Sequence, residues 1–499
     1  MNNQLPTELG KAATGILGLD DVLSGGLTRG GIFLLEGEPG SGKTTVALQF
    51  LLNGATGGET CLYITLSETI QELKAGAASH GWSIPDNIVI RELIPAESLA
   101  KGESQSLFYA SDLELSEASA QIYAAVDEVQ PSRLVIDSLS EIRLLAQSSL
   151  RYRRELLAIK HHFARLHTTV LLLDDLTSEV TDKTVHSIAH GVIQLQQLYP
   201  NFGAERRRVR VLKYRGQKYR GGFHDFTINT GGVNVYPRLV AAEHRTRVPR
   251  TTIPTGLLPF DTLMGGGVDS GSSTLIMGPS GTGKSLIAIT FALSAIQRGE
   301  QAALFVFDEE LGLLFDRMQH LNIDLQDLRN RGKLRIEQID AAELSPGEFS
   351  YLVRKTVDHE RIKTVIIDSL NGYQAAMTEE KSVVLHIHEL LQYLNRQGAA
   401  TFITMAQHGL VGQMTTPTDV TYIADTVILL RYFEATGHLR RAVSCIKKRT
   451  GPHEATIREF HIGAGGLVVD EPLTQFQGVL QGIPHLLDVS PRAVLERPW

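Results

Sequence analysis

One short pattern occurs twice in this chain, and it limits the possible folds more than any other feature. Residues 37–44 and 278–285 both fit the phosphate-loop pattern G-x-x-x-x-G-K-[ST], and each segment follows an apolar run and opens a helical pattern. The loop lysines, Lys43 and Lys284, lie 241 positions apart, and the segments around each loop repeat at the same interval. The sequence therefore predicts two copies of one nucleotide-binding domain.

The length of the chain fits this duplication, because 499 residues are too many for one ordinary domain but suit two of about 240. We expect a first domain at 12–246, a linker at 247–254, a second domain at 255–475 and a C-terminal tail at 476–499. Two prolines and several β-branched residues disfavour a helix in the linker. Strands alternate with helical patterns in both copies, which predicts α/β domains with mainly parallel sheets flanked by helices.

Composition argues against several classes of function. Apolar residues make up 42% and charged residues 21% of the chain, as in ordinary soluble proteins, and the net charge of −7 disfavours constitutive binding to DNA or anionic membranes. With only two cysteines, Cys61 and Cys445, we expect neither a disulfide framework nor a cysteine-based metal site. We also see no signal peptide and no apolar run long enough to cross a bilayer. The expected location is the cytoplasm, with no membrane partner.

The two phosphate loops predict two ATP sites. Their glycines let backbone N–H groups surround a phosphate, and the N-terminus of the following helix adds a favourable dipole. Lys43 and Lys284 should reach the β- and γ-phosphates, while Thr44 and Ser285 should bind Mg²⁺. The residues expected to hold ATP are Gly37, Glu38, Pro39, Gly40, Ser41, Gly42, Lys43, Thr44 and Thr45 in the first copy, and Gly278, Pro279, Ser280, Gly281, Thr282, Gly283, Lys284, Ser285 and Leu286 in the second.

Acidic residues follow neighbouring strands in both copies. Asp137 and Asp368 end apolar strands at the sheet edge where α/β proteins bind ligands, so we expect them to support Mg²⁺; capping of the next loop is the alternative. Glu68 in the first copy, and Asp308 with Glu309 in the second, follow another strand. These carboxylates could orient or deprotonate an attacking water, and the alternative is an ordinary surface carboxylate.

Two basic pairs end matching β-rich segments, Lys213 with Arg215 and Lys447 with Arg449. Side chains two apart on a strand point to the same side, so each pair could hold the γ-phosphate of a neighbouring subunit. The residues alone leave a second interpretation open, in which each pair is a solvated basic strand edge.

Taken together, these features resemble the KaiC family of double-domain RecA-like ATPases over about residues 12–475. The resemblance rests on both phosphate loops, the glutamates and Asp-Ser pairs at strand ends, the Lys-x-Arg pairs and the T-G-[IL]-x-x-[FL]-D header that opens each copy. It implies tandem RecA-like P-loop domains in two stacked rings, usually homohexameric, with ATP at the subunit interfaces and the Lys-x-Arg pairs acting in trans. The resemblance also implies that family members hydrolyse ATP in the first ring. The family's namesake, the cyanobacterial clock protein, in addition phosphorylates a Ser-Thr pair in its second ring.

This chain departs from the family pattern at two places. Where the family has two successive glutamates, the first copy has Ser67 before Glu68, and the second has Asp308 in place of the first glutamate. At the phosphorylation positions this chain has Thr421 followed by Tyr422, so Thr421 is the candidate phosphoacceptor.

We therefore expect an ATPase with serine/threonine autokinase capacity in its second domain, acting as a signalling or timing switch. A regulatory protein would bind the C-terminal tail or a ring face, although the tail has no recognisable match to the segment that recruits the clock protein's activator. Two alternatives stay open: a RecA-like ATPase stimulated by DNA, and a nucleotide-bound scaffold without catalysis. The acidic net charge and the lack of a clear aromatic-basic loop make DNA an unexpected partner.

Overall fold

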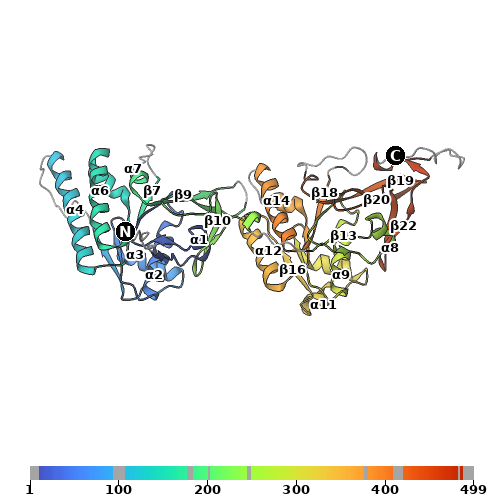
Figure 1. The fold of residues 1–499 in the computed structure, drawn as a ribbon, viewed down its shortest axis with the longest axis horizontal. Helices are drawn as coiled ribbons and strands as arrows, with labels where there is room; N and C mark the ends of the chain where they lie inside the picture. Colours follow the sequence, from blue (N-terminus) through green and yellow to red (C-terminus); the bar gives the residue numbers. More distant parts are fainter. Residues whose placement is uncertain are drawn as a thin grey trace, which may run out of the picture. The chain divides into compact units, whose positions relative to one another are not determined.

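The computed structural model describes residues 10–93, 107–176, 184–200, 203–243, 249–375, 380–407, 409, 420–481 and 484–486. The chain divides into two compact units, Met1–Arg238 and Leu239–Trp499 (Figure 1). Among the described helices, none is both long and apolar enough to cross a membrane.

The first unit is built on a nine-stranded sheet in the order β11-β10-β9-β8-β3-β7-β6-β4-β5. The strands from β8 to β5 in this order run parallel, and β9, β10 and β11 extend the sheet in antiparallel fashion. Its strands are β3 (Ile32–Gly37), β4 (Cys61–Thr65), β5 (Ile88–Glu92), β6 (Arg133–Asp137), β7 (Thr169–Asp175), β8 (Gly191–Leu198), β9 (Arg206–Tyr214), β10 (His224–Asn229) and β11 (Gly232–Tyr236), and β1 (Lys11–Ala12) pairs separately with β2 (Leu27–Thr28).

Helices cover both faces of this sheet, which explains why its central strands are continuous apolar runs. Along β3, Phe33 and Leu35 pack with α2, while Ile32 and Leu34 face the core formed with α4, α5 and α6 (Figure 1). The helices are α1 (Leu17–Val22), α2 (Lys43–Thr56), α3 (Ile70–Ser79), α4 (Leu107–Val129), α5 (Leu139–Ala146), α6 (Ser149–Leu166) and α7 (Thr184–Ile188).

The second unit repeats this architecture with a sheet in the order β16-β15-β17-β18-β14-β19-β20-β21-β22. Strands β16 to β19 in this order are parallel, and β20 to β22 are the antiparallel extension. The strands are β14 (Ser273–Gly278), β15 (Ala302–Val306), β16 (Leu334–Gln338), β17 (Thr364–Asp368), β18 (Ala400–Ala406), β19 (Thr426–Ala435), β20 (His438–Lys448), β21 (Arg458–Gly463) and β22 (Gly466–Pro472).

The helices of the second unit again form one core on each face of the sheet. They are α8 (Leu258–Leu263), α9 (Lys284–Gln297), α10 (Leu311–Gln319), α11 (Leu325–Asn330), α12 (Pro346–Glu360), α13 (Leu370–Ala375) and α14 (Glu380–Arg396), with 3-10 turns η2 (Ala241–Glu243) and η3 (Val479–Gln481). The prediction of tandem RecA-like α/β domains with mainly parallel sheets is therefore confirmed.

Two short pairings lie in segments for which the sequence indicated little structure. β12 (Thr252–Ile253), within the expected linker, pairs with β13 (Val268–Asp269) of the second unit. In the expected tail, β23 (Phe476–Gln477) pairs with β24 (His485–Leu486), and Val479 is buried against β19 and β20. The described beginning of the tail is thus part of the second unit's fold.

Candidate active sites

In both units the phosphate loop joins the central strand to a helix, β3 to α2 and β14 to α9. The last loop residues, Gly42 and Gly283, have φ angles of 97° and 101°, in the left-handed region that favours glycine. A Cβ added to Gly42 would lie 2.5 Å from the Cδ1 of Ile228, and one on Gly283 would lie 3.0 Å from that of Ile462. The backbone therefore turns sharply into each helix, leaving N–H groups at its first turn to bind an anion.

The lysine of the first loop is engaged by its surroundings. Lys43 Nζ donates to the carbonyl oxygens of Gly37 and Glu38, both at 3.0 Å, and lies 2.7 Å from the carboxylate of Asp175 at the end of β7. Because Asp175 pairs with Gly37 in the sheet, its position is set by the register of β3 and β7. The sequence analysis did not identify Asp175.

The second loop lysine has different neighbours. Lys284 Nζ donates to the carbonyl oxygen of Pro279 at 2.8 Å. Burial lowers the pKa of Lys284, and the nearby carboxylate of Asp368 acts in the opposite direction. The sheet position that Asp175 occupies in the first unit belongs here to Ala406, which pairs with Gly278. The second loop therefore lacks the carboxylate that pairs with the first loop lysine.

The predicted Mg²⁺ residues of the first unit lie together. Thr44 Oγ1, in the first turn of α2, lies 3.5 Å from Asp137 Oδ2, which also accepts a hydrogen bond of 2.5 Å from the hydroxyl of Tyr63 on β4. Burial raises the pKa of Asp137, and the bond from Tyr63 opposes this effect. The sequence analysis missed Tyr63, whose position in the second unit is taken by Leu304.

These residues suit the way proteins hold Mg²⁺. Among the described residues, no group of three or more His, Cys, Asp and Glu side chains could hold a metal by itself. Mg²⁺ bound to nucleotides usually takes only one or two protein ligands and completes its shell with phosphates and waters. A hydroxyl and a carboxylate beside a phosphate loop meet that requirement in both units, with Thr44 and Asp137 in the first and Ser285 and Asp368 in the second.

The candidate base of the first unit, Glu68, is half-buried beyond the end of β4. Its backbone N–H donates to Thr65 Oγ1 at 2.9 Å, which fixes the loop that carries it. Burial and then the nearby carboxylate of Asp137 raise the pKa of Glu68. A carboxylate with a raised pKa is a better proton acceptor, which suits the base expected at this place.

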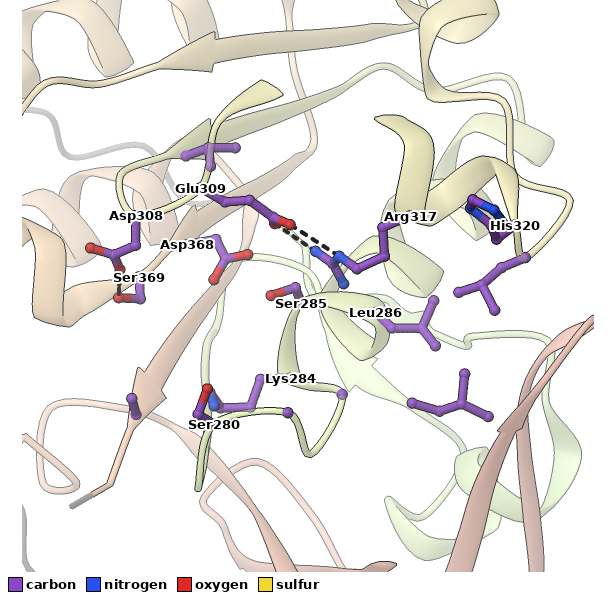
Figure 2. Close-up of a pocket in the computed structure, with 16 residues that line it drawn as sticks. Ser280, Lys284, Ser285, Leu286, Asp308, Glu309, Arg317, His320, Asp368 and Ser369 are labelled. Carbon is purple, nitrogen blue, oxygen red and sulfur yellow. Dashed lines mark hydrogen bonds and ion pairs between the residues drawn. The ribbon is translucent and has the colours of Figure 1, made fainter. Parts of the chain in front are cut away.

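A cavity of about 630 Å³ opens beside the second phosphate loop (Figure 2). The cavity brings together most of the residues predicted for the second phosphate loop and its acidic neighbours. Three of the predicted loop residues, Gly278, Pro279 and Thr282, do not line it. Thr282 is buried, and its hydroxyl donates to the Pro279 carbonyl oxygen at 2.8 Å. The lining residues are Ser280, Gly281, Gly283, Lys284, Ser285, Leu286, Val306, Asp308, Glu309, Arg317, His320, Leu321, Asp368, Ser369, Ala406 and Ile462.

The two acidic residues of this cavity have different partners. Asp308 accepts a hydrogen bond from the hydroxyl of Ser369, which directly follows Asp368. Glu309 forms an ion pair with Arg317 of α10, drawn as dashed lines in Figure 2. The sequence analysis did not identify Arg317 or Ser369.

The Lys-x-Arg pair of the second unit holds the turn that carries Thr421. Lys447 Nζ donates to the carbonyl oxygens of Thr421 and Ala424, both at 2.7 Å, and Arg449 Nη2 donates to that of Tyr422 at 2.5 Å. Thr421 is partly buried just before β19, a strand paired with β14, which leads into the phosphate loop.

The first unit repeats these contacts with a different side chain. Lys213 Nζ donates to the carbonyl oxygens of His186 and Ala189, and Arg215 Nη2 to that of Ser187 at 2.5 Å. Burial and the neighbouring Arg215 lower the pKa of Lys213. By these contacts, His186 takes the place that Thr421 has in the second unit.

Unlike a threonine, His186 contacts a buried carboxylate: its Nε2 lies within hydrogen-bond distance, 2.7 Å, of Oε2 of Glu36. A comparison of the two copies around each Lys-x-Arg pair is the signal that could have revealed this difference.

Two aromatic residues near the basic run Arg206–Arg208, Tyr214 and Phe223, are engaged within the unit. Tyr214 is buried, and its hydroxyl donates to the carbonyl oxygen of Gly26 at 2.8 Å. The guanidinium groups of Arg208 and Arg210 lie 3.9 and 4.7 Å from the ring centre of Phe223. These two rings are therefore already in contact with protein groups and are poorly placed to stack on nucleic-acid bases.

The comparisons with known proteins agree with this architecture. The KaiC ATPase family model matches residues 12–240 and 253–474. The chain is 29% identical to the circadian clock oscillator protein KaiC of Thermosynechococcus vestitus, over 99% of this chain and 95% of the relative. It is 26% identical to that of Synechococcus elongatus, over 99% and 96%, and 27% identical to the circadian clock protein KaiC3 of Synechocystis, over 95% and 94%. With both of its repeats matched by the family model, this chain belongs to the KaiC family of ATPases.

Proposed function

We propose that this chain is an ATP-hydrolysing switch whose second unit also transfers phosphate to its own Thr421. One observation carries the second part: Lys447 and Arg449, the pair expected to contact a γ-phosphate, both donate to carbonyl oxygens in the 421–424 turn. The expected phosphate clamp therefore contacts the same turn that carries the acceptor hydroxyl.

For hydrolysis, a water attacks the γ-phosphorus as the bond to the β–γ bridging oxygen breaks, and a carboxylate takes the water's proton. In the first unit this carboxylate is Glu68, whose raised pKa favours proton uptake. Lys43 neutralises charge on the β- and γ-phosphates, and Thr44 and Asp137 hold Mg²⁺. Mg²⁺ supplies charge stabilisation on the phosphate oxygens.

For phosphotransfer, the hydroxyl of Thr421 replaces water as the nucleophile, and Asp308 or Glu309 takes its proton. The proposed assembly is a homohexamer with ATP between subunits, so the clamp and Thr421 of one subunit approach the cavity of its neighbour. In the first unit, His186 occupies the corresponding turn position, which favours transfer to water there.

The switch role rests on this difference between the units. Phosphate on Thr421 would add negative charge beside Lys447 and Arg449, and a regulatory protein at the tail or a ring face would respond to the resulting change. We place the protein in the cytoplasm and expect it to need neither DNA nor a membrane.

The test is to incubate the purified chain with γ-labelled ATP and Mg²⁺ and to map the label by mass spectrometry. Thr421→Val should remove the label, while Tyr422→Phe, on the same turn, should keep it. Lys284→Ala should stop labelling, and Lys43→Ala should reduce hydrolysis by the first unit. Hydrolysis without any label on Thr421 would reject the kinase function, and hydrolysis that requires DNA would favour the DNA-dependent alternative.

A further inference from the structure

The ion pair between Glu309 and Arg317 occupies both oxygens of a candidate catalytic carboxylate. Arg317 Nε donates to Glu309 Oε1 at 3.1 Å, and its Nη2 donates to Oε2 at 2.6 Å. This two-bond arrangement is the strong and directional form of an arginine–carboxylate pair. As Figure 2 shows, the pair directs the carboxylate of Glu309 toward α10, on the opposite side from the bond between Asp308 and Ser369.

The first unit cannot form this pair. Helices α3 and α10 follow the same acidic position in the two copies, and the residue that corresponds to Arg317 is Gly76. Gly76 has no side chain to reach Glu68, and a Cβ at that position would contact nothing within 4 Å. The difference is therefore a property of the second site alone.

The pair has a direct consequence for proton transfer. To accept a proton from water or from a hydroxyl, Glu309 must turn an oxygen toward that group, and the bidentate pair holds both oxygens toward Arg317. The side chains of Glu309 and Arg317 are 29% and 41% exposed, so water can compete for both partners and the pair can open.

We propose that Arg317 is a positioning residue that restrains Glu309 and thereby slows turnover in the second site. The inference rests on the proposed function, because it assumes that Glu309 acts on the bound nucleotide. As the pair is partly exposed, the restraint is modest: its removal should raise the rate about two- to fivefold.

The experiment uses the full chain with Glu68→Gln, which removes the base of the first site but keeps its phosphate loop for ATP-dependent assembly, so that only the second site turns over. It measures kcat and KM for ATP with Mg²⁺. Arg317→Gln should raise kcat by the stated factor and leave KM unchanged. Arg317→Lys keeps the charge without the planar two-bond geometry, so its kcat should lie between those of the parent and Arg317→Gln. The control is Arg331→Gln, which removes an exposed arginine–carboxylate pair with Asp327 on the next helix and should change neither constant.

A second measurement follows the pair without catalysis, by carbodiimide labelling of carboxylates in the nucleotide-free protein. Glu309 should be labelled faster in Arg317→Gln than in the parent, with the exposed Glu471 as internal reference. Equal labelling, an unchanged or lower kcat, or a higher KM in Arg317→Gln would each overturn the restraint. Absence of turnover in every variant, with labelling that still depends on Arg317, would instead overturn the proposed activity of the second site while supporting the restraint of the Glu309 carboxylate by Arg317.

Discussion

Removal of the Tyr63 hydroxyl should weaken Mg²⁺ binding in the first site. The hydroxyl donates to Asp137 at 2.5 Å, and Tyr63 is fully buried. A hydrogen bond to a charged group contributes about 1.5–3 kcal/mol to the free energy of unfolding. A side chain that orients a metal ligand typically changes metal affinity about 10- to 100-fold. Tyr63→Phe should therefore destabilise the first unit by about 1.5–3 kcal/mol and raise its Mg²⁺ requirement by at least about tenfold.

The effect should also depend on pH, with a definite sign. The bond from Tyr63 opposes the rise that burial causes in the pKa of Asp137. Without the bond this pKa rises further, so Asp137 takes up a proton at a higher pH and can no longer support Mg²⁺. The loss of activity on the acidic side should therefore begin at a higher pH in Tyr63→Phe than in the parent.

The assay is Mg²⁺-dependent ATP hydrolysis by the full chain with Lys284→Ala, at mildly acidic and mildly alkaline pH. The matched control is Tyr123→Phe, which removes a longer bond of 3.4 Å from a tyrosine on α4 to Glu155. Identical Mg²⁺ midpoints in Tyr63→Phe and its parent at both pH values would refute the reasoning. A similar shift in Tyr123→Phe would show that it is not specific to Asp137.

Three further changes test other parts of the sites. Lys43→Ala should abolish nucleotide-dependent assembly of the first ring, measured by light scattering; a hexamer that forms unchanged without bound nucleotide would contradict a site between subunits. Gly42→Ala places a Cβ 2.5 Å from Ile228 at a φ of 97°, so ATP binding to the first site should fall at least about tenfold in calorimetry, and unaltered affinity would count against the proposed loop geometry. Glu309→Gln should remove phosphotransfer to Thr421, and persistent labelling would reject Glu309 as essential.

The fold could be predicted because its main signals are local in the sequence. A buried parallel strand must be apolar on both faces, so the apolar runs 134–136 and 365–367 identified β6 and β17. The glycines before Lys43 and Lys284 mark the left-handed turn into each helix, which makes the phosphate loops recognisable from spacing alone.

The contacts that distinguish the two sites could not be predicted in this way. Tyr63 meets Asp137 only because β4 and β6 are neighbours, and Asp175 meets Lys43 only because β7 lies beside β3. Neither contact has a characteristic spacing in the sequence. A position-by-position comparison of the copies near each motif would have drawn attention to these residues, because the second unit has Leu304 and Ala406 at the corresponding positions.

These differences give the two sites different electrostatic settings. In the first, a carboxylate, Asp175, pairs with the loop lysine, while Asp137 helps to raise the pKa of Glu68. In the second, a cation, Arg317, pairs with the candidate base. A divalent cation stabilises a cluster of carboxylates more than it stabilises a site in which an arginine already neutralises one of them. We therefore expect turnover in the first site to depend more strongly on Mg²⁺, and turnover in the second site to depend on opening of the Glu309 pair.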